Sequence, residues 1–352
     1  MNIRLSFAAR AALLFVVCVT TIFLIASENA SGRYAQLFST IIQQNNQAGV
    51  AYAIESQSRL LFVGDLMLAR VVEQVIDNSE PDYIHTGMRS LYETHGYQIA
   101  NFESTIPKSH TPTRPYTYQF STRAEHAYQT IAAGFTHLSL ANNHSKDFGI
   151  AEYHNTVEFI ELNGATAFGM NYQVGSSSVT VINAGLERVA LIGIDLTLSD
   201  VSEGDVAEIF ATARNQSDQQ IVYVHWGTEY AAVHNTRQER YATLFVKYGA
   251  DLIIGHHPHV VQDVGLIQNV PVFYSLGNYI FDQYFSTEVQ LGLVLSVDAI
   301  ARTVTILPVS TIETPMSPRV LEPEASRVFL SQIAARSDGQ LTSSIEEGTV
   351  RY

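Results

Sequence analysis

Residues 249–261, GADLIIGHHPHVV, carry the pattern on which the interpretation of the whole chain depends. The short apolar run Leu252–Ile254 ends at a glycine, which is typical of a buried strand. Three imidazoles follow at once, those of His256, His257 and His259. Ligands of open α/β sheets bind in the loops beyond the strand ends, and neutral imidazole is the commonest metal ligand. A lone histidine here would indicate a structural hydrogen bond, but this cluster predicts a metal site.

Length and composition are those of an ordinary globular protein. The chain has 352 residues, enough to bury a substantial core in one large domain or two. It is 46% hydrophobic and 15% charged, with a formal net charge of -14. This acidic balance argues against a nucleic-acid backbone as partner and against electrostatic adhesion to anionic lipid. A net negative charge of this kind is typical of a solvent-exposed protein surface.

The N-terminal residues predict a membrane anchor. Arg4 and Arg10 precede an uncharged apolar run, Ala11–Ala26, and polar residues follow it, which are the features of an export signal. No good cleavage motif stands beside Ser27, so we expect residues 1–30 to be an uncleaved signal anchor, a cytoplasmic tip plus one transmembrane run. A cleaved signal peptide is the alternative. The arginines keep the N-terminus in the cytoplasm, which places the domain outside the inner membrane, facing the periplasm or exterior.

Three further segments follow the anchor. We expect a linker or helix over residues 31–58, an α/β domain over 59–310, and a C-terminal helix and tail over 311–352, loose after Ser337. The only cysteine, Cys18, lies inside the apolar run. The exported part therefore has no disulfide and no thiolate ligand, so oxygen and imidazole groups must hold any metal.

Two carboxylates and an amide follow the first strands of the domain. Asp65 closes a strand that begins at Leu60, where it could bind a metal or cap the next helix. Strand Tyr97–Ala100 leads to Asn101 and Glu103. Side chains two positions apart in an extended segment point to the same side, so these two groups could converge on one site. An Asx-turn is the alternative for this segment.

Strand Thr136–Leu140 ends at a segment rich in polar donors. Asn142, Asn143, His144 and Asp147 follow one another closely there. An asparagine oxygen can bind a divalent cation, and a nearby histidine can protonate a leaving group. A solvated loop is a poor explanation for this composition.

Histidine recurs at another strand end. His225 directly follows a predicted strand, and Trp226 and Glu229 come after it. A buried core histidine is the alternative for His225, but its place at the strand exit favours a ligand. Strand Val270–Tyr274 then leads to Asn278, a further amide beyond a strand.

The donors at these strand ends belong to one chemical class. Carboxylate, amide and imidazole groups without thiols suit Zn, Mn, Fe or Mg, and this many ligands could hold two ions. Two such ions polarise a phosphoryl oxygen and activate water, which is the chemistry of hydrolases. Because the donors recur at the same end of successive strands, the sequence predicts one shared site.

Six motifs, taken together and in order, resemble the CapA family of bacterial capsule, or poly-γ-glutamate, synthesis proteins. They are Val-Gly-Asp-Leu-Met-Leu, Asn-Phe-Glu-Ser, Leu-Ala-Asn-Asn-His-x-x-Asp-x-Gly, His-Trp-Gly-x-Glu-Tyr, Gly-His-His-Pro-His-Val and Tyr-Ser-Leu-Gly-Asn-Tyr-Ile-Phe-Asp, between about Leu60 and Val297. The resemblance implies a calcineurin-like metallophosphatase fold, a β-sandwich flanked by helices with its site at the strand ends. It also implies membrane anchoring, an extracytoplasmic domain, and partners such as an anionic cell-surface polymer, its precursor or membrane synthase subunits.

The resemblance also gives roles to single residues. It implies that His144 is the general acid, and we expect Asp147 and Glu229 to take part in catalysis beside it. The metal ligands that it implies are Asp65, Asn101, Glu103, Asn143, His225, His257 and His259. Further residues expected to line the site are Asn142, His256, Trp226 and Asn278.

The sequence departs from the metallophosphatase pattern at two places. Met67 stands where that pattern has a histidine, and Asn101-x-Glu103 replaces Gly-Asp, which leaves fewer ligands for one ion. Three hypotheses therefore remain. The first is an anchored metal-dependent hydrolase or transferase that acts on a cell-surface polymer or its precursor, and the second is a non-catalytic partner that binds the polymer or a synthase. The third is a soluble phosphodiesterase with a cleaved signal.

Overall fold

The central strands are apolar on both faces because each face is covered. In strand β7 (Gln219–His225), Ile221 and Tyr223 point into one hydrophobic cluster, whereas Val222 and Val224 belong to another. Side chains alternate between the two faces of a strand, so both faces of β7 are buried. The apolar runs of the sequence therefore mark the middle layers of the fold.

The structure is a computed structural model that describes residues 56–80, 82–169 and 175–352, and Ser56–Tyr352 form one unit. The predicted signal anchor and nearly all of the predicted linker lie outside the described residues. Among the helices in those ranges, none is both long and apolar enough to cross a membrane.

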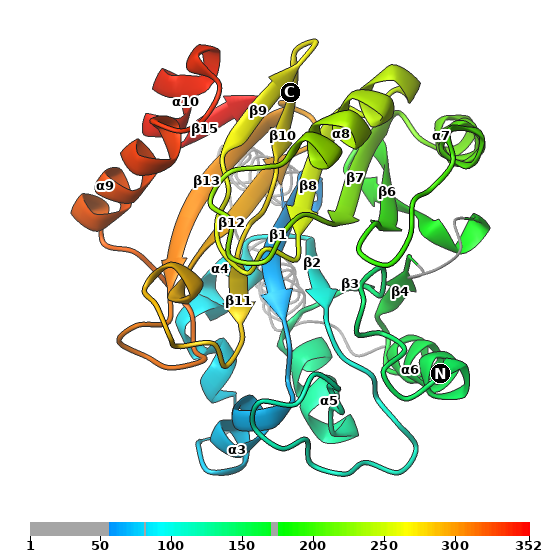
Figure 1. The fold of residues 1–352 in the computed structure, drawn as a ribbon, viewed down its shortest axis with the longest axis vertical. Coiled ribbons are helices and arrows are strands. Elements are labelled where there is room, and N and C mark those ends of the chain that lie inside the picture. The colour runs from blue at the N-terminus through cyan, green and yellow to red at the C-terminus, as the bar shows by residue number, and fades with distance from the viewer. Residues whose placement is uncertain (1–55, 81, 170–174) are drawn as a thin grey trace, which may run out of the picture. The chain divides into compact units, whose positions relative to one another are not determined.

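The larger of the two sheets formed by the described residues has nine strands (Figure 1). They are β1 (Arg59–Leu66), β2 (Tyr97–Phe102), β3 (His137–Ser139), β4 (Thr166–Phe168), β11 (Asn278–Ile280), β12 (Leu291–Asp298), β13 (Thr303–Ser310), β14 (Arg319–Val320) and β15 (Thr349–Arg351). Strands β1 to β4 run parallel and in order, whereas β12 pairs antiparallel with both β1 and β13. Strand β11 pairs with the end of β1, and β14 and β15 pair with β13.

The smaller sheet has six strands among the described residues, in the order β5-β6-β7-β8-β10-β9. Besides β7, they are β5 (Val179–Ala184), β6 (Glu187–Asp195), β8 (Leu252–His256), β9 (Val264–Ile267) and β10 (Val270–Phe273). The four middle strands are parallel, and the outer strands β5 and β9 pair antiparallel with their neighbours. Strands β5 and β6 are joined by a tight turn and form a hairpin.

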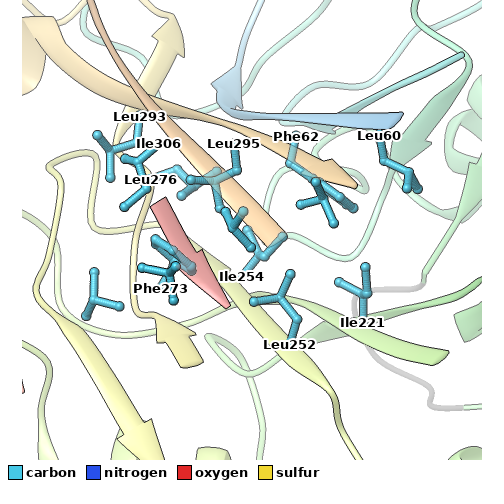
Figure 2. Close-up of a cluster of buried hydrophobic side chains, with 14 of the residues drawn as sticks. Leu60, Phe62, Ile221, Leu252, Ile254, Phe273, Leu276, Leu293, Leu295 and Ile306 are labelled. Atoms are coloured by element: carbon cyan, nitrogen blue, oxygen red, sulfur yellow. The ribbon is translucent and has the colours of Figure 1, made fainter. Parts of the chain in front are cut away.

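The two sheets pack face to face around a shared hydrophobic core (Figure 2). Leu60, Phe62 and Leu295 of the larger sheet belong to the same buried cluster as Ile221 and Ile254 of the smaller one. Each of these side chains contributes about 1.5–3 kcal/mol by leaving water. Burial of the facing sides therefore holds the sandwich together.

Most of the helices cover the outer faces of the sandwich, whereas the last two lie beside β13 and β15 (Figure 1). Helices α3 to α6 share a buried cluster with the larger sheet, α7 and α8 share another with the smaller sheet, and α9 and α10 contribute to the central core. Their bounds are α3 Arg70–Asp77, α4 Arg89–Glu93, α5 Ala124–Ala133, α6 Ile150–Leu162, α7 Glu203–Gln216, α8 Thr236–Tyr248, α9 Pro323–Ala334 and α10 Thr342–Glu346. Short 3-10 segments are η1 (Tyr83–Met88), η2 (Ser176–Ser178), η3 (Glu288–Gln290) and η4 (Gly339–Leu341). The predicted α/β sandwich with flanking helices is confirmed.

The prediction of a loose tail after Ser337 is wrong. That segment forms η4, α10 and β15, and β15 pairs with the start of β13. Leu341, Ile345 and Val350 are 6%, 0% and 1% exposed and belong to the central core. Their wide spacing among Ser, Thr, Gly and Glu residues makes a weak sequence signal, although three well-placed apolar side chains suffice to anchor the segment.

A close backbone approach joins β11 to the end of β1. The backbone N–H of Asp65 donates to the carbonyl oxygen of Gly277 at 3.0 Å. A Cβ on Gly64 would lie 2.1 Å from that oxygen, and Gly277 itself has a φ of +70°. Glycine is therefore required at both positions, and this contact fixes the backbone on which Asp65 stands.

We expect Ile345→Ala to destabilise the protein by about 2–5 kcal/mol, because it leaves a cavity where α10 meets the core. Urea unfolding followed by circular dichroism would measure the change. The control Glu347→Ala, at an exposed position of the same segment, should stay within about 0.5 kcal/mol of the parent protein. Equal stability of the two variants would show that the tail does not pack as described.

Candidate metal centre

Donors from both sheets meet where their parallel strands end. Asp65 lies in β1 and Asn101 in β2, whereas His225 ends β7 and His256 ends β8. Direct contacts join the two sets: Asn101 Nδ2 lies 3.2 Å from His225 Nδ1, and His256 Nδ1 lies 3.3 Å from Asp65 Oδ1. The structure thus brings together groups that lie far apart in the sequence.

Asp65 is the central carboxylate of this cluster and is completely buried. Its Oδ1 accepts a hydrogen bond from Asn101 Nδ2 at 2.8 Å, and its Oδ2 lies 3.1 Å from His259 Nδ1. The alternative role as a helix cap is wrong, because α3 begins later and has Ala69 at its N-cap.

Asn101 and Asn142 form a hydrogen-bonded support beneath the carboxylates. Asn101 Nδ2 faces Asp65 and also lies 3.3 Å from Glu103 Oε2, while Asn101 Oδ1 accepts a hydrogen bond from Asn142 Nδ2 at 3.0 Å. Asn142 Nδ2 additionally donates to the carbonyl oxygen of Phe102 at 2.9 Å. In this arrangement the oxygen of Asn101 accepts a hydrogen bond from Asn142 and its Nδ2 faces the carboxylates. Asn101 therefore orients Asp65 and Glu103 and does not present its oxygen to a metal ion. The Asx-turn alternative is not needed to explain this residue.

Two groups of residues have the composition and spacing of metal ligands. Within each group, one ligand atom per residue lies within 4.8 Å of the others. The groups are Asp65, Glu103 and His225, and Glu229, His257 and His259. His259 also links them, because its Nε2 lies 3.8 Å from Glu103 Oε1. Since ligand atoms lie about 2.0–2.3 Å from such an ion, small side-chain shifts would complete either site.

Several buried oxygen and nitrogen atoms of this cluster fit a cation because no hydrogen bond satisfies them. Among the described residues, Glu103 Oε1, His257 Nδ1 and both ring nitrogens of His256 make no hydrogen bond of normal geometry. The His256 contact with Asp65 is close enough for electrostatic attraction, but its angles are poor. An unpaired buried polar atom costs about 1–3 kcal/mol, which a bound ion would recover. The oxygen and imidazole donors suit Zn, Mn, Fe or Mg.

Two of the imidazoles are held in their neutral, metal-binding form. Burial lowers the pKa of His257 to about 3, and the nearby charge of His259 adds to the effect. Burial, followed by the proximity of the His257 imidazole, also holds the pKa of His225 well below its usual value. Each ring therefore keeps one unprotonated nitrogen at neutral pH.

The pKa values of Asp65, Glu103 and His259 depend on one another. Burial alone would raise the pKa of Asp65, but the imidazoles of His256 and His259 outweigh it and hold this pKa well below its usual range. Burial raises the pKa of Glu103 well above its usual range. For His259, burial is outweighed by Glu103 and Asp65, which raise its pKa to about 9. In the absence of a cation a proton on His259 balances the carboxylates, and a metal ion would replace that proton.

His144 and Asp147 form a second functional unit beside these ligands. His144 Nδ1 lies 2.9 Å from Asp147 Oδ2, which fixes the ring, and His144 Nε2 lies 3.8 Å from Glu103 Oε1. Asp147 thus orients the imidazole from behind, and Nε2 remains directed at the ligand cluster. This is the geometry that a proton donor beside a metal site requires.

Besides Asn101, two further amides contact the imidazoles directly. Asn143 Oδ1 lies 2.8 Å from His225 Nε2, so both could serve the same ion. Asn278 Oδ1 lies 3.0 Å from His259 Nδ1, and Asn278 Nδ2 donates to the carbonyl oxygen of Val289 at 3.0 Å. Asn143 therefore stands in the ligand cluster, whereas Asn278 orients one of its members.

Trp226 does not line the site, contrary to the prediction. It follows His225 directly, and alternation sends its side chain to the opposite face of the smaller sheet. There it is 1% exposed, stacks with Phe245, and donates from Nε1 to the carbonyl oxygen of Tyr274 at 2.8 Å. Trp226 is a core residue that anchors the strand on which His225 stands.

The turn after β8 is strained at its two metal-binding histidines. His257 and His259 have φ values of 95° and 58°, a region that residues other than glycine rarely adopt. Pro258 separates them and fixes its own backbone angle. Backbone strain of this kind is concentrated at functional sites, where the surrounding structure maintains it.

Sequence reasoning missed four residues around His144. Arg70, Phe120, Phe281 and Asp282 lie beside the ligand cluster and contact one another. Asp282 closes one of the six motifs, but nothing in the sequence pairs it with an arginine more than two hundred positions earlier.

The family described as Bacterial capsule synthesis protein PGA_cap matches residues 59–283. The chain is 29% identical over 250 residues to the PGA biosynthesis protein CapA of Bacillus subtilis strain 168, and 29% identical over 258 residues to the capsule biosynthesis protein CapA of Bacillus anthracis. These alignments cover 63% and 67% of this chain, and 63% and 62% of the two relatives. The chain thus matches less than two thirds of the length of either relative.

Two crystal structures show a distant similarity in fold. They are those of a hypothetical protein from Thermus thermophilus, with a TM-score of 0.45 and 16% identity, and of 5'-nucleotidase from Candida albicans, with a TM-score of 0.42 and 12% identity. The alignments cover 75% and 73% of this chain and 99% and 52% of the other chains.

We expect the purified full-length protein to bind a divalent cation, and Asp65→Asn or His257→Gln to weaken that binding by about 100-fold or more. The loss should exceed the 10- to 100-fold cost of removing an outer-shell partner, because each change removes a donor itself. Equilibrium dialysis against Mn²⁺ and Zn²⁺, followed by elemental mass spectrometry, would measure it. His154→Gln, at an exposed position of α6, is the matched control. Unchanged affinity in Asp65→Asn would argue against this centre.

Proposed function

The chain belongs to the family of bacterial capsule synthesis proteins described as PGA_cap, and on that premise we propose that it serves in the synthesis or export of an anionic cell-surface polymer of the capsule or poly-γ-glutamate type. The names of its two relatives from Bacillus support the same role. We further propose that its partners are the polymer or its precursor, together with membrane synthase subunits.

We propose a metal-dependent hydrolase or transferase as the biochemical activity, within a metallophosphatase-like fold. The observation that carries this proposal is that two ligand groups and a histidine–aspartate pair lie at one edge of the sandwich. When bound there, a divalent ion would act as a Lewis acid toward a phosphoryl or carbonyl oxygen. The residues that would hold one or two such ions are Asp65, Glu103, Asn143, His225, Glu229, His257 and His259.

The chain's own residues would perform the proton transfer. His144 presents Nε2 toward the ligand cluster, so it could donate a proton to a leaving oxygen. Asp147 holds Nδ1 and thereby fixes which nitrogen faces the substrate. Asp65, Glu103 and His225 are buried, and the low dielectric around them strengthens electrostatic interactions with a bound substrate.

We propose that this reaction takes place outside the inner membrane. The support is the apolar run Ala11–Ala26 behind two arginines, which is typical of a single-pass signal anchor. The domain would then face the periplasm or exterior, where a surface polymer is assembled.

One observation favours a non-catalytic role on the same fold. Met67 is fully buried, and its Sδ accepts a hydrogen bond from the backbone N–H of Ala69 at 2.9 Å. The position at which related enzymes are expected to supply a histidine is therefore occupied by an inward-facing thioether. In this second hypothesis the site binds the polymer or a synthase through a cation without reacting.

We expect His144→Gln to lower the metal-dependent hydrolysis of a chromogenic phosphodiester by about 10²–10⁴-fold, because it removes the proton donor. Metal affinity should stay within about threefold of the parent protein, since the ligand groups remain. Activity would be measured on full-length protein loaded with Mn²⁺ or Zn²⁺, with His154→Gln as control. The same variants would be tested for polymer production in cells that lack the native protein. Wild-type production with His144→Gln would support the non-catalytic hypothesis.

A further inference from the structure

Arg70 is a charged residue that the proposed reaction does not use and that the fold nevertheless buries. Its side chain is 8% exposed and pairs with Asp282, whose side chain is 5% exposed. The same carboxylate accepts a hydrogen bond from the backbone N–H of Val71 at 3.2 Å, at the first turn of α3. Arg70 also has a φ of 56°, in the left-handed region. A buried charge and an unfavourable backbone conformation at one residue indicate a specific role.

The guanidinium of Arg70 joins segments that are far apart in the sequence. Its Nη1 donates to the carbonyl oxygen of Thr117 at 3.2 Å, and its Cζ lies 4.6 Å from the ring centre of Phe120. The ring centre of Phe281 lies 5.5 Å from the same carbon. Thr117 and Phe120 belong to the connection between β2 and α5, whereas Phe281 and Asp282 follow β11. Arg70 thus ties that connection to the body of the domain.

Phe120 connects Arg70 to the pair formed by His144 and Asp147. Its ring stacks on the imidazole of His144, with centres 3.9 Å apart and planes 29° apart. Its backbone N–H donates to Asp147 Oδ2 at 2.7 Å, and that oxygen also contacts His144 Nδ1. The ring and the backbone of one residue therefore fix both members of the pair.

We propose that Arg70 is a positioning residue for His144. It holds Phe120 through the Thr117 hydrogen bond and the cation–π contact, and Phe120 keeps the imidazole turned toward the ligand cluster. This inference rests on the proposed function, because that function makes His144 the proton donor. A purely structural clamp would stabilise α3 without changing His144, so the test has to separate local positioning from overall stability.

The variant that isolates the guanidinium is Arg70→Asn. Asparagine tolerates the left-handed backbone conformation, so this change removes the side chain without adding backbone strain. The matched control is Arg89→Asn, which removes an exposed arginine from its ion pair with Asp82. Thermal unfolding of both variants confirms that they are folded at the temperature of the experiment.

The first measurement needs no enzymatic activity. Full-length protein is treated with diethyl pyrocarbonate, and the modification rates of His144 and the exposed His154 are compared by peptide mass mapping. His144 is only 9% exposed, so its release from Phe120 in Arg70→Asn should raise its rate relative to His154 by about tenfold, through local opening. Phe120→Leu should produce the same change if Arg70 acts through Phe120. The control Arg89→Asn should leave the ratio unchanged.

The second measurement uses the phosphodiester assay of the proposed function. Arg70→Asn should lower kcat by about 10²-fold and leave KM within about twofold, because a displaced proton donor impairs the reaction more than binding. Added methylguanidinium should restore part of the lost kcat.

The two proposals fail in different ways. If the parent protein hydrolyses nothing but Arg70→Asn and Phe120→Leu both expose His144, the proposed reaction is wrong and the positioning role stands. An unchanged ratio of His144 to His154 modification in folded Arg70→Asn would overturn the positioning role, whatever the activity. If Arg70→Asn does not fold, an unchanged ratio in Phe120→Leu overturns that role in the same way.

Discussion

A fully buried carboxylate must find hydrogen-bond donors or positive charge to replace the water that it loses. Asp65 is in this position, and its compensation comes from the amide of Asn101 and from the imidazoles of His256 and His259. These groups stand at the ends of different strands, in both sheets of the sandwich. The need to compensate one buried charge therefore draws the ends of β1, β2 and β8 together. The same contacts assemble the ligand groups, so the stability of this edge and its chemistry depend on one another.

The backbone around Asp65 is as constrained as its side chain. Gly64 and Gly277 let β11 approach β1 more closely than any residue with a Cβ would allow. This approach places Asn278, the first residue of β11, where its oxygen meets His259. A motif near the C-terminal end of the matched region thus contributes to a site whose first carboxylate, Asp65, lies more than two hundred positions earlier. It does so by orienting His259 and not by supplying a ligand atom.

The sequence predicts which polar side chains meet at this edge, because parallel strands end at a common edge of their sheet. Polar side chains seldom cluster at such an edge for structural reasons alone, so their recurrence there indicates a site. The sequence is less informative about the role of each donor. Asn101 has the right chemistry for a ligand, but a neighbouring amide engages its oxygen. Strand alternation could have placed Trp226 in the core. The pairing of Arg70 with Asp282 could not have been predicted, because neither local propensity nor periodicity connects residues so distant in sequence.

The charge of the site bears on the substrate that it could take. Four carboxylates interact in this region of an acidic chain, those of Asp65, Glu103, Asp147 and Glu229. They would repel an anionic polymer, and the buried cation of Arg70 is already committed to Asp282. Neutralisation must come from the proton on His259 or from a divalent ion, which also offers a contact point for a substrate anion. A divalent ion at this site would therefore serve binding as well as reaction, and the catalytic and non-catalytic hypotheses differ in whether His144 transfers a proton.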